Sequence, residues 1–250
     1  MNKLSVSMKI YIGLIILLAF CSMFSVYMSE GILAIMPDQS LPAPKPVMAL
    51  VNFVIIIILY GGLGFIGLKL STKIGFPDLW DNKISNKNRI LFPAIIGIII
   101  GIILIIVDSI FTNIFSLPKQ IHPDFPFSII ASITAGIGEE TIFRLFLISF
   151  WVWLVSNKLL KNKYGNIVFW IVVIITSISF ALGHIPSVIL LLGVKTFAEI
   201  PFWLIIEIIL LNSLISIICA INFRKYGIIS AMVLHFCTDI VWHVIWGLIV

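Results

Sequence analysis

Long, almost uninterrupted apolar runs alternate with short polar stretches along this chain. A transmembrane helix needs roughly 20 mostly apolar residues. A shorter apolar run at 186–197 is either an eighth span or a re-entrant segment. The pattern therefore predicts an all-α fold, a polytopic membrane helix bundle of seven or eight transmembrane helices. The seven longer runs predict spans near residues 9–29, 47–69, 91–115, 128–155, 166–184, 202–221 and 227–249.

The composition excludes a soluble domain. The chain has 250 residues, of which 61% are hydrophobic and 11% charged, whereas soluble domains average roughly 25% charged residues. No polar stretch is long enough to form a second domain, so we expect a single membrane domain over 1–250. The high content of Ile, Lys and Asn is typical of AT-rich genomes, and we expect a multi-pass protein of a bacterial cell membrane.

The formal net charge of +5 comes from basic residues in the polar stretches between apolar runs. This is the pattern of cytoplasmic loops, and it places the N-terminus and the loops 70–90 and 158–165 in the cytoplasm. Arg224 and Lys225 lie on that side only if 186–197 does not cross the bilayer. No basic stripe interleaved with aromatic residues is present, so we expect the lipid bilayer and no nucleic acid as a partner.

Glycines within the apolar runs predict close helix packing. Residues 62–67 match the pattern G-x-G-x-x-G, but a dinucleotide fingerprint needs a strand before it, and here the glycines lie inside an apolar run. Gly97 and Gly101 form a G-x-x-x-G pair, which is typical of close contact between two membrane helices.

Ionisable residues inside the predicted spans are the candidates for function. On insertion scales an Asp, Lys or Arg at the centre of a span costs about 2.5–3.5 kcal/mol, so the presence of an ionisable residue there indicates a role. All but Asp108 lie in the second half of the chain, which predicts a scaffold of early helices and a working core of later ones. We expect Glu207 to line a cavity or pair with a loop lysine, whereas Asp108 has no evident partner. The nine residues are Asp108, Glu139, Glu140, Arg144, His184, Glu207, His235, Asp239 and His243.

Glu139 and Glu140 are adjacent, but helix geometry separates them. Glu140 lies four residues before Arg144, the favourable orientation for an ion pair on one helix face. Glu139 points about 100° away from Glu140, so it has no cation of its own. A buried carboxylate in that situation can act as a general base. The alternative is a cluster of ion pairs that only holds helices together.

Histidines supply further polar groups. His184 follows Phe180 by four residues, and His235 precedes Asp239 by four. The spacing of His235 and Asp239 directs both side chains into one cavity, where they could orient a substrate, hold a metal or relay protons. His243 continues the same stripe nearer the end of its span.

Three motifs occur in order within apolar runs: Glu-Glu-x-x-x-Arg (139–144), Phe-x-x-x-His (180–184) and His-x-x-x-Asp (235–239). Together they resemble the CAAX protease and bacteriocin-processing family (CPBP, or Abi), whose members are intramembrane endopeptidases similar to type II CAAX prenyl endopeptidases. The resemblance covers roughly residues 90–250 as the catalytic core, and the two N-terminal helices of 1–70 are less diagnostic. Bacterial members are linked to bacteriocin maturation or immunity.

The resemblance implies a role for each motif residue. Glu139 would activate water with help from His184, and His235 with Asp239 would stabilise the oxyanion of the tetrahedral intermediate. The supporting residues would be Glu140, Arg144, Phe180 and His243. No cofactor is expected under this glutamate mechanism. The alternative is a zinc site, whose ligands would be Glu139, His184, His235 and Asp239.

Asp239 departs from the family pattern, in which this position is commonly Asn. A carboxylate donates no hydrogen bond unless it is protonated, and its charge repels an oxyanion. Asp239 would then hold His235 or His243 in a charged, donating state, or join a metal site, or mark a member that has lost activity.

The expected function is hydrolysis of a peptide bond in a membrane-associated protein or peptide, CAAX-like or bacteriocin-related, so the expected partner is a membrane-anchored or hydrophobic peptide substrate. A non-catalytic membrane binding or immunity protein would use the same polar cavity without cleavage. A proton-coupled transporter is a third interpretation, because acids and histidines also build proton relays. The substrate and the oligomeric state do not follow from the sequence.

Overall fold

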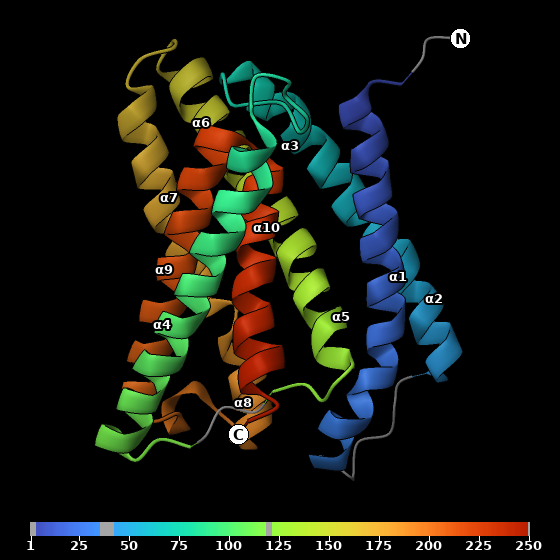
Figure 1. The fold of residues 1–250 in the computed structure, drawn as a ribbon, viewed down its shortest axis with the longest axis vertical. Helices are drawn as coiled ribbons and strands as arrows, with labels where there is room; N and C mark the ends of the chain where they lie inside the picture. Colours follow the sequence, from blue (N-terminus) through green and yellow to red (C-terminus); the bar gives the residue numbers. More distant parts are fainter. Residues whose placement is uncertain (1–3, 36–42, 119–121, 250) are drawn as a thin grey trace.

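The computed structural model describes residues 4–35, 43–118 and 122–249; part of the proline-rich connector before the second span lies outside these ranges. Within them, the secondary structure consists of helices without strands (Figure 1). The α-helices are α1 (Val6–Ile35), α2 (Lys45–Ile55), α3 (Gly61–Lys73), α4 (Phe92–Phe115), α5 (Phe127–Thr134), α6 (Ser149–Val152), α7 (Gly165–Leu182), α8 (Ile185–Leu192), α9 (Phe202–Tyr226) and α10 (Ile228–Asp239). The π-helical segments are η1 (Ile56–Tyr60), η2 (Lys87–Leu91), η3 (Ala135–Ile148), η4 (Trp153–Leu159) and η6 (Ile240–Trp246), and η5 (Phe197–Glu199) is a 3-10 turn.

Seven helical stretches of the described residues are long and apolar enough to cross a membrane, which confirms the predicted membrane helix bundle. The predicted spans overlap all seven, although several helices extend past the predicted ends because polar residues at the interface continue the helix. The observed spans are Val6–Tyr27, Lys45–Lys73, Lys87–Phe115, Phe127–Leu159, Gly165–Leu192, Phe202–Tyr226 and Ile228–Trp246.

The short apolar run 186–197 does not form an eighth span. Its helical part, α8, follows α7 after a turn at Gly183 and ends at Gly193, whose φ of +64° closes the helix. Eight helical residues extend only about 12 Å, well short of the bilayer core. In Figure 1, α8 lies at the lower end of the bundle. Ile185 joins a small apolar cluster there with Leu117 and Leu204, and this cluster holds α8 at that end.

The basic connectors therefore meet at one end, the upper end in Figure 1. The Ser7 hydroxyl donates to the carboxylate of Asp78 in the loop after α3, at 2.5 Å. Arg224 at the end of α9 donates to Asn166 at the start of α7, at 2.8 Å. Seven crossings thus place Arg224 and Lys225 on the side of the N-terminus. The excess of basic residues predicts that this end faces the cytoplasm.

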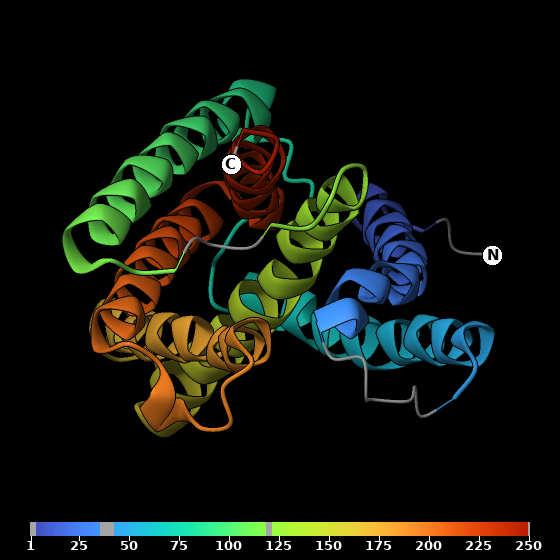
Figure 2. The same ribbon diagram turned by 90° about the horizontal axis from the view of Figure 1, so that it is seen from below.

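The third motif lies on a central helix, α10. It packs against α4 and α9 on one side and against η3 on the other. Viewed from below, α1 to α3 stand at one flank of the bundle, α4, α7 and α9 stand at the other, and the span that contains α5 and η3 runs between them (Figure 2). The two helices that carry the acidic and histidine motifs, η3 and α10, therefore face each other inside the bundle.

Glycines permit two of these close contacts. A Cβ added at Gly97 of α4 would collide with the backbone oxygen of Leu234 in α10, and one at Gly67 of α3 would collide with the backbone of Leu145 in η3. Gly64 likewise abuts Tyr11 and Thr141. The predicted helix-packing role is confirmed for these positions, whereas a Cβ at Gly62 would meet nothing within 4 Å.

We expect Gly97→Ala to lower the free energy of unfolding by about 1–3 kcal/mol, because the new methyl group overpacks the contact between α4 and α10. Gly62→Ala is the matched control, since it makes the same change in a helix where space is open. Urea unfolding of both variants in detergent compares them. Equal stability of the two variants would contradict the close contact.

Candidate active site

Glu140 lies at the centre of a buried polar network between η3 and α10. Its Oε1 accepts a hydrogen bond from Nδ1 of His235 at 2.7 Å and lies 3.2 Å from Nη1 of Arg144. Glu140 is fully buried, and Arg144 is 1% exposed. The predicted pair of Glu140 and Arg144 is present even though η3 is π-helical, because residues four apart still share a face. The contact with His235 was not predicted, since it joins residues far apart in the chain.

Glu139 faces the other way, as its position in the helix predicts. Its side chain is 35% exposed, and its Oε2 has no hydrogen-bond partner among the described residues. The nearest cationic candidate comes from another helix: Nε2 of His235 lies 3.7 Å from Glu139 Oε2. The two adjacent glutamates thus differ in environment, because one is enclosed in an ion-pair network and the other borders open space.

His235 connects the buried network to that open space. A carboxylate only accepts hydrogen bonds, so the Nδ1 that contacts Glu140 carries a proton. The other nitrogen, Nε2, lies 3.7 Å from both Glu139 Oε2 and Asp239 Oδ2. A carboxylate behind the ring fixes its orientation and balances a positive charge on it.

Phe180 positions His184, the histidine of the second motif. The Nδ1 of His184 contacts the backbone oxygen of Phe180 at 2.9 Å, and because a carbonyl only accepts, this nitrogen carries the proton. The Phe180 ring lies 5.0 Å from the ring of His184 and 5.9 Å from that of His235. The guanidinium of Arg144 lies 4.7 Å from the same ring on its way to Glu140. Phe180 is therefore the apolar support shared by all three motifs.

His243 has a partner that the sequence did not indicate. Its Nδ1 lies 3.3 Å from Nδ1 of His122, which is in the connector before α5. Burial lowers the pKa of His122, which favours the neutral form of its ring. Among the described residues, Asp239 lies within ion-pair distance of His235 and not of His243. His122 could not be found from spacing, because it lies in a polar connector outside the apolar runs.

A cavity of about 560 Å³ joins the predicted catalytic side chains. This volume is in the range of sites that bind small ligands or peptide segments. Glu140 and Arg144 do not line it and lie behind its wall. The scaffold helices also contribute, with Leu18 and Ser22 of α1 and Tyr60 of η1. The predicted site residues that line the cavity are Glu139, His184, His235, Asp239 and His243.

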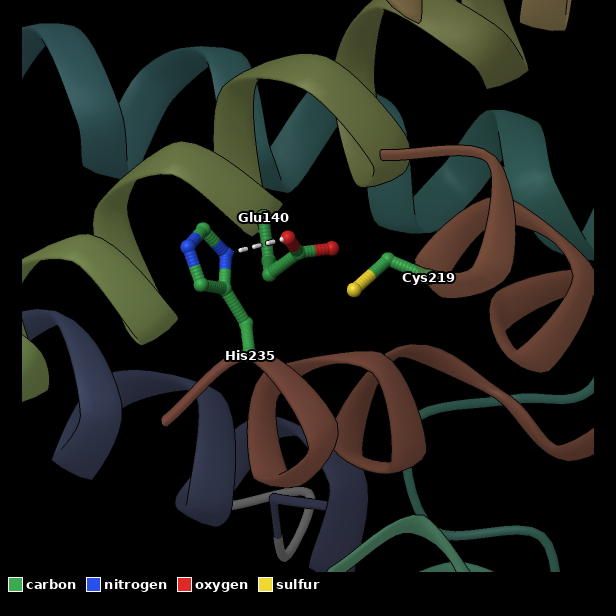
Figure 3. Close-up of side chains that lie close together, drawn as sticks. All are labelled: Glu140, Cys219 and His235. Carbon is green, nitrogen blue, oxygen red and sulfur yellow. Dashed lines mark hydrogen bonds and ion pairs between the residues drawn. The ribbon is translucent and has the colours of Figure 1, made fainter. Parts of the chain in front are cut away.

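Three donors of kinds that bind metals lie within 4.8 Å of one another: a carboxylate oxygen of Glu140, the sulfur of Cys219 and a ring nitrogen of His235 (Figure 3). This group does not fit a metal ion. The Arg144 guanidinium already supplies a positive charge 3.2 Å from Glu140, and a metal beside it would be repelled. The predicted zinc set differs from this group. Its four side chains share the cavity wall, and its use of a metal stays a prediction.

Asp108 and Glu207 form a pair that the sequence did not reveal. The two carboxyl groups, on α4 and α9, are hydrogen-bonded to each other. Both are buried, and Glu207 also lines the cavity. The predicted cavity position of Glu207 is confirmed, whereas its alternative pairing with a loop lysine is wrong. Asp108 does have a partner, because α9 brings an acid to it from the other half of the chain.

A family model described as Rce1-like, type II CAAX prenyl endopeptidase Rce1-like, matches residues 121–241. The matched segment is a little under half of the chain, and it contains all three motifs and the buried network of Glu140, Arg144 and His235. No curated protein and no solved structure matches the chain significantly. The match confirms the resemblance that the motifs predicted: residues 121–241 of this integral membrane protein are similar to the Rce1-like domain of type II CAAX prenyl endopeptidases.

Proposed function

We propose that this protein is an intramembrane endopeptidase that hydrolyses a peptide bond of a membrane-associated protein or peptide, with Glu139 activating the attacking water. One observation carries the proposal. Oε2 of Glu139, which has no hydrogen-bond partner among the described residues, borders the cavity 3.7 Å from Nε2 of His235, and the other ring nitrogen of His235 is anchored by Glu140. The family of residues 121–241 supplies the reaction class.

The proposed reaction needs one base and one donor. Glu139 takes a proton from water, and the resulting hydroxide attacks the carbonyl carbon of the substrate. His235, protonated on both nitrogens, donates from Nε2 to the oxyanion that forms. When the C–N bond breaks, Glu139 returns its proton to the leaving amine. One water is consumed, and the products are a new carboxyl end and a new amino end.

Asp239 fits this scheme through His235. Its Oδ2 lies 3.7 Å from Nε2, too far for a direct hydrogen bond but close enough to balance a positive charge on the ring. Together with Glu140 it places negative charge on both sides of His235. The positively charged ring of His235 then lies between Asp239 and the oxyanion. Its charge offsets the repulsion between the Asp239 carboxylate and the oxyanion. His184 completes the wall, with Nε2 available to hold the water.

The substrate we propose is a CAAX-like or bacteriocin-related peptide that is anchored in the membrane. Mass spectrometry of membrane proteins from cells with and without this protein tests the reaction. New peptide termini that appear only with the active protein support it, and cells with Glu139→Gln provide the inactive comparison. If the two sets of termini are identical, the non-catalytic binding or immunity function becomes the better account.

We expect cleavage by the purified protein to survive a strong chelator, because the proposed base and oxyanion donor are side chains. Initial rates in proteoliposomes are compared before and after treatment with EDTA and 1,10-phenanthroline, with a known zinc protease as the positive control. Loss of activity that added zinc restores would favour the metal set of Glu139, His184, His235 and Asp239.

A further inference from the structure

The acid pair of Asp108 and Glu207 lies outside the proposed catalytic steps. A hydrogen bond between two carboxyl groups requires a proton on at least one of them, so the pair carries at most one negative charge. Asp108 is 6% exposed and Glu207 is 2% exposed. No lysine, arginine or histidine makes an ion pair with either acid among the described residues. A negative charge in an apolar interior without a cation is costly.

Each acid also keeps an oxygen without a partner. Oδ1 of Asp108 and Oε2 of Glu207 are buried and accept no hydrogen bond within the described structure. Glu207 lies on the cavity wall, and Asp108 is the hydrogen-bonded group behind it. A ligand group in the cavity with several N–H donors and a positive charge could donate to Oε2 of Glu207 and balance a negative charge on the pair. An ammonium or a guanidinium group has this chemistry.

The cavity connects the acid pair to the proposed catalytic centre. Along α9 its lining runs from Glu207 to Ile215, and one turn further Cys219 lies beside Glu140 and His235. The proposed catalytic residues Glu139 and His235 line the same cavity as Glu207, so one extended peptide can reach both positions.

We propose that Glu207, with Asp108 behind it, forms a recognition subsite for a lysine or arginine side chain of a peptide bound in the cavity that Glu139 and His235 also line. The inference rests on the proposed function for the nature of the occupant, a peptide. It adds a selection rule: among membrane-anchored peptides, this protein prefers those with one basic residue within an otherwise apolar segment.

Peptide binding to the Glu139→Gln protein in nanodiscs tests the subsite without any cleavage. The probe is a fluorescent, lipid-anchored apolar peptide in which one lysine is moved through successive positions, and norleucine replaces that lysine in the reference peptide. We expect one window of positions to bind about tenfold or more tightly than the reference, the gain typical of a charge-assisted hydrogen bond in a buried site.

Adding Glu207→Gln or Asp108→Asn is expected to remove the preference for lysine and to leave the affinity for the norleucine peptide unchanged. Glu199→Gln is the matched control, because it removes an exposed acid near the start of α9 and should keep the preference. Glu207→Lys is expected to reverse it, so that a peptide with glutamate in the window binds more tightly. Thermal unfolding of each variant verifies that it is folded.

Equal affinity for the lysine and norleucine peptides at every position would overturn the subsite. So would an equal loss for both peptides in Glu207→Gln, which would assign the pair a role in helix packing. The tests of the two proposals are independent. If the wild-type protein cleaves no peptide but still prefers the lysine peptide, the endopeptidase function is overturned and the subsite is retained.

Discussion

Glu139→Gln is expected to lower the kcat of peptide hydrolysis by about 10²–10⁴-fold, the usual contribution of a general base. An amide cannot take the proton from water, while its shape is that of the carboxylate. The change should leave the fold intact, because Glu139 borders the cavity and takes no part in the buried ion pair of Glu140 and Arg144. Initial rates in proteoliposomes measure the loss.

Substrate binding provides the complementary measurement for that variant. The affinity for an uncleaved peptide should change little, because Glu139 acts on the water and not on the anchored part of the substrate. Glu199→Gln makes the same chemical change at an exposed position outside the cavity, and its kcat should equal that of the wild type. A Glu139→Gln protein with kcat within about twofold of wild type would remove Glu139 from the mechanism.

Glu140→Ala is expected to lower the free energy of unfolding by about 3–5 kcal/mol, the usual cost of leaving one partner of a buried ion pair alone. Arg144 is 1% exposed and would keep a charge with no carboxylate beside it. His235 would also lose the acceptor for Nδ1. Unfolding by heat or denaturant in detergent measures the effect.

The neighbouring residue supplies the control. Glu139→Ala makes the same change one position away, outside the ion pair, and we expect it to cost within about 1 kcal/mol. Removing both charges in Glu140→Leu with Arg144→Leu should recover part of the stability, because no buried charge is left unpaired. If Glu140→Ala is as stable as Glu139→Ala, the network does not hold η3 against α10.

Much of this site could be predicted because the contacts within each motif join residues only four positions apart on one helix. Glu140 and Arg144 lie four residues apart, so any helical backbone brings them together, and the same backbone turns Glu139 away. His235 and Asp239 share a face for the same reason. The predicted close contacts at Gly97 and Gly101 also follow from local spacing, since only glycine lets two helix backbones approach so closely.

The contacts that were missed join distant parts of the chain. His235 donates to Glu140 across two helices, His122 meets His243, and Asp108 meets Glu207. Periodicity within one helix carries no information on which face of another helix it meets. The run 186–197 was ambiguous for a similar reason, because its hydropathy suits a span and its position is set by packing against Leu117 and Leu204.

The sequence by itself determined the class of molecule, a membrane bundle of seven or eight helices, because long apolar segments in a bilayer must satisfy their backbone groups internally, as a helix does. The structure decided for seven spans among the described residues. The sequence also determined that Glu140, and not Glu139, pairs with Arg144, because helical geometry is local. Only the tertiary structure decided that His235 is anchored by Glu140, that one cavity joins the motifs, and that a second acid pair lies along the same cavity. Those features depend on which helices lie next to each other, and this arrangement is decided by how side chains fit together over the whole bundle.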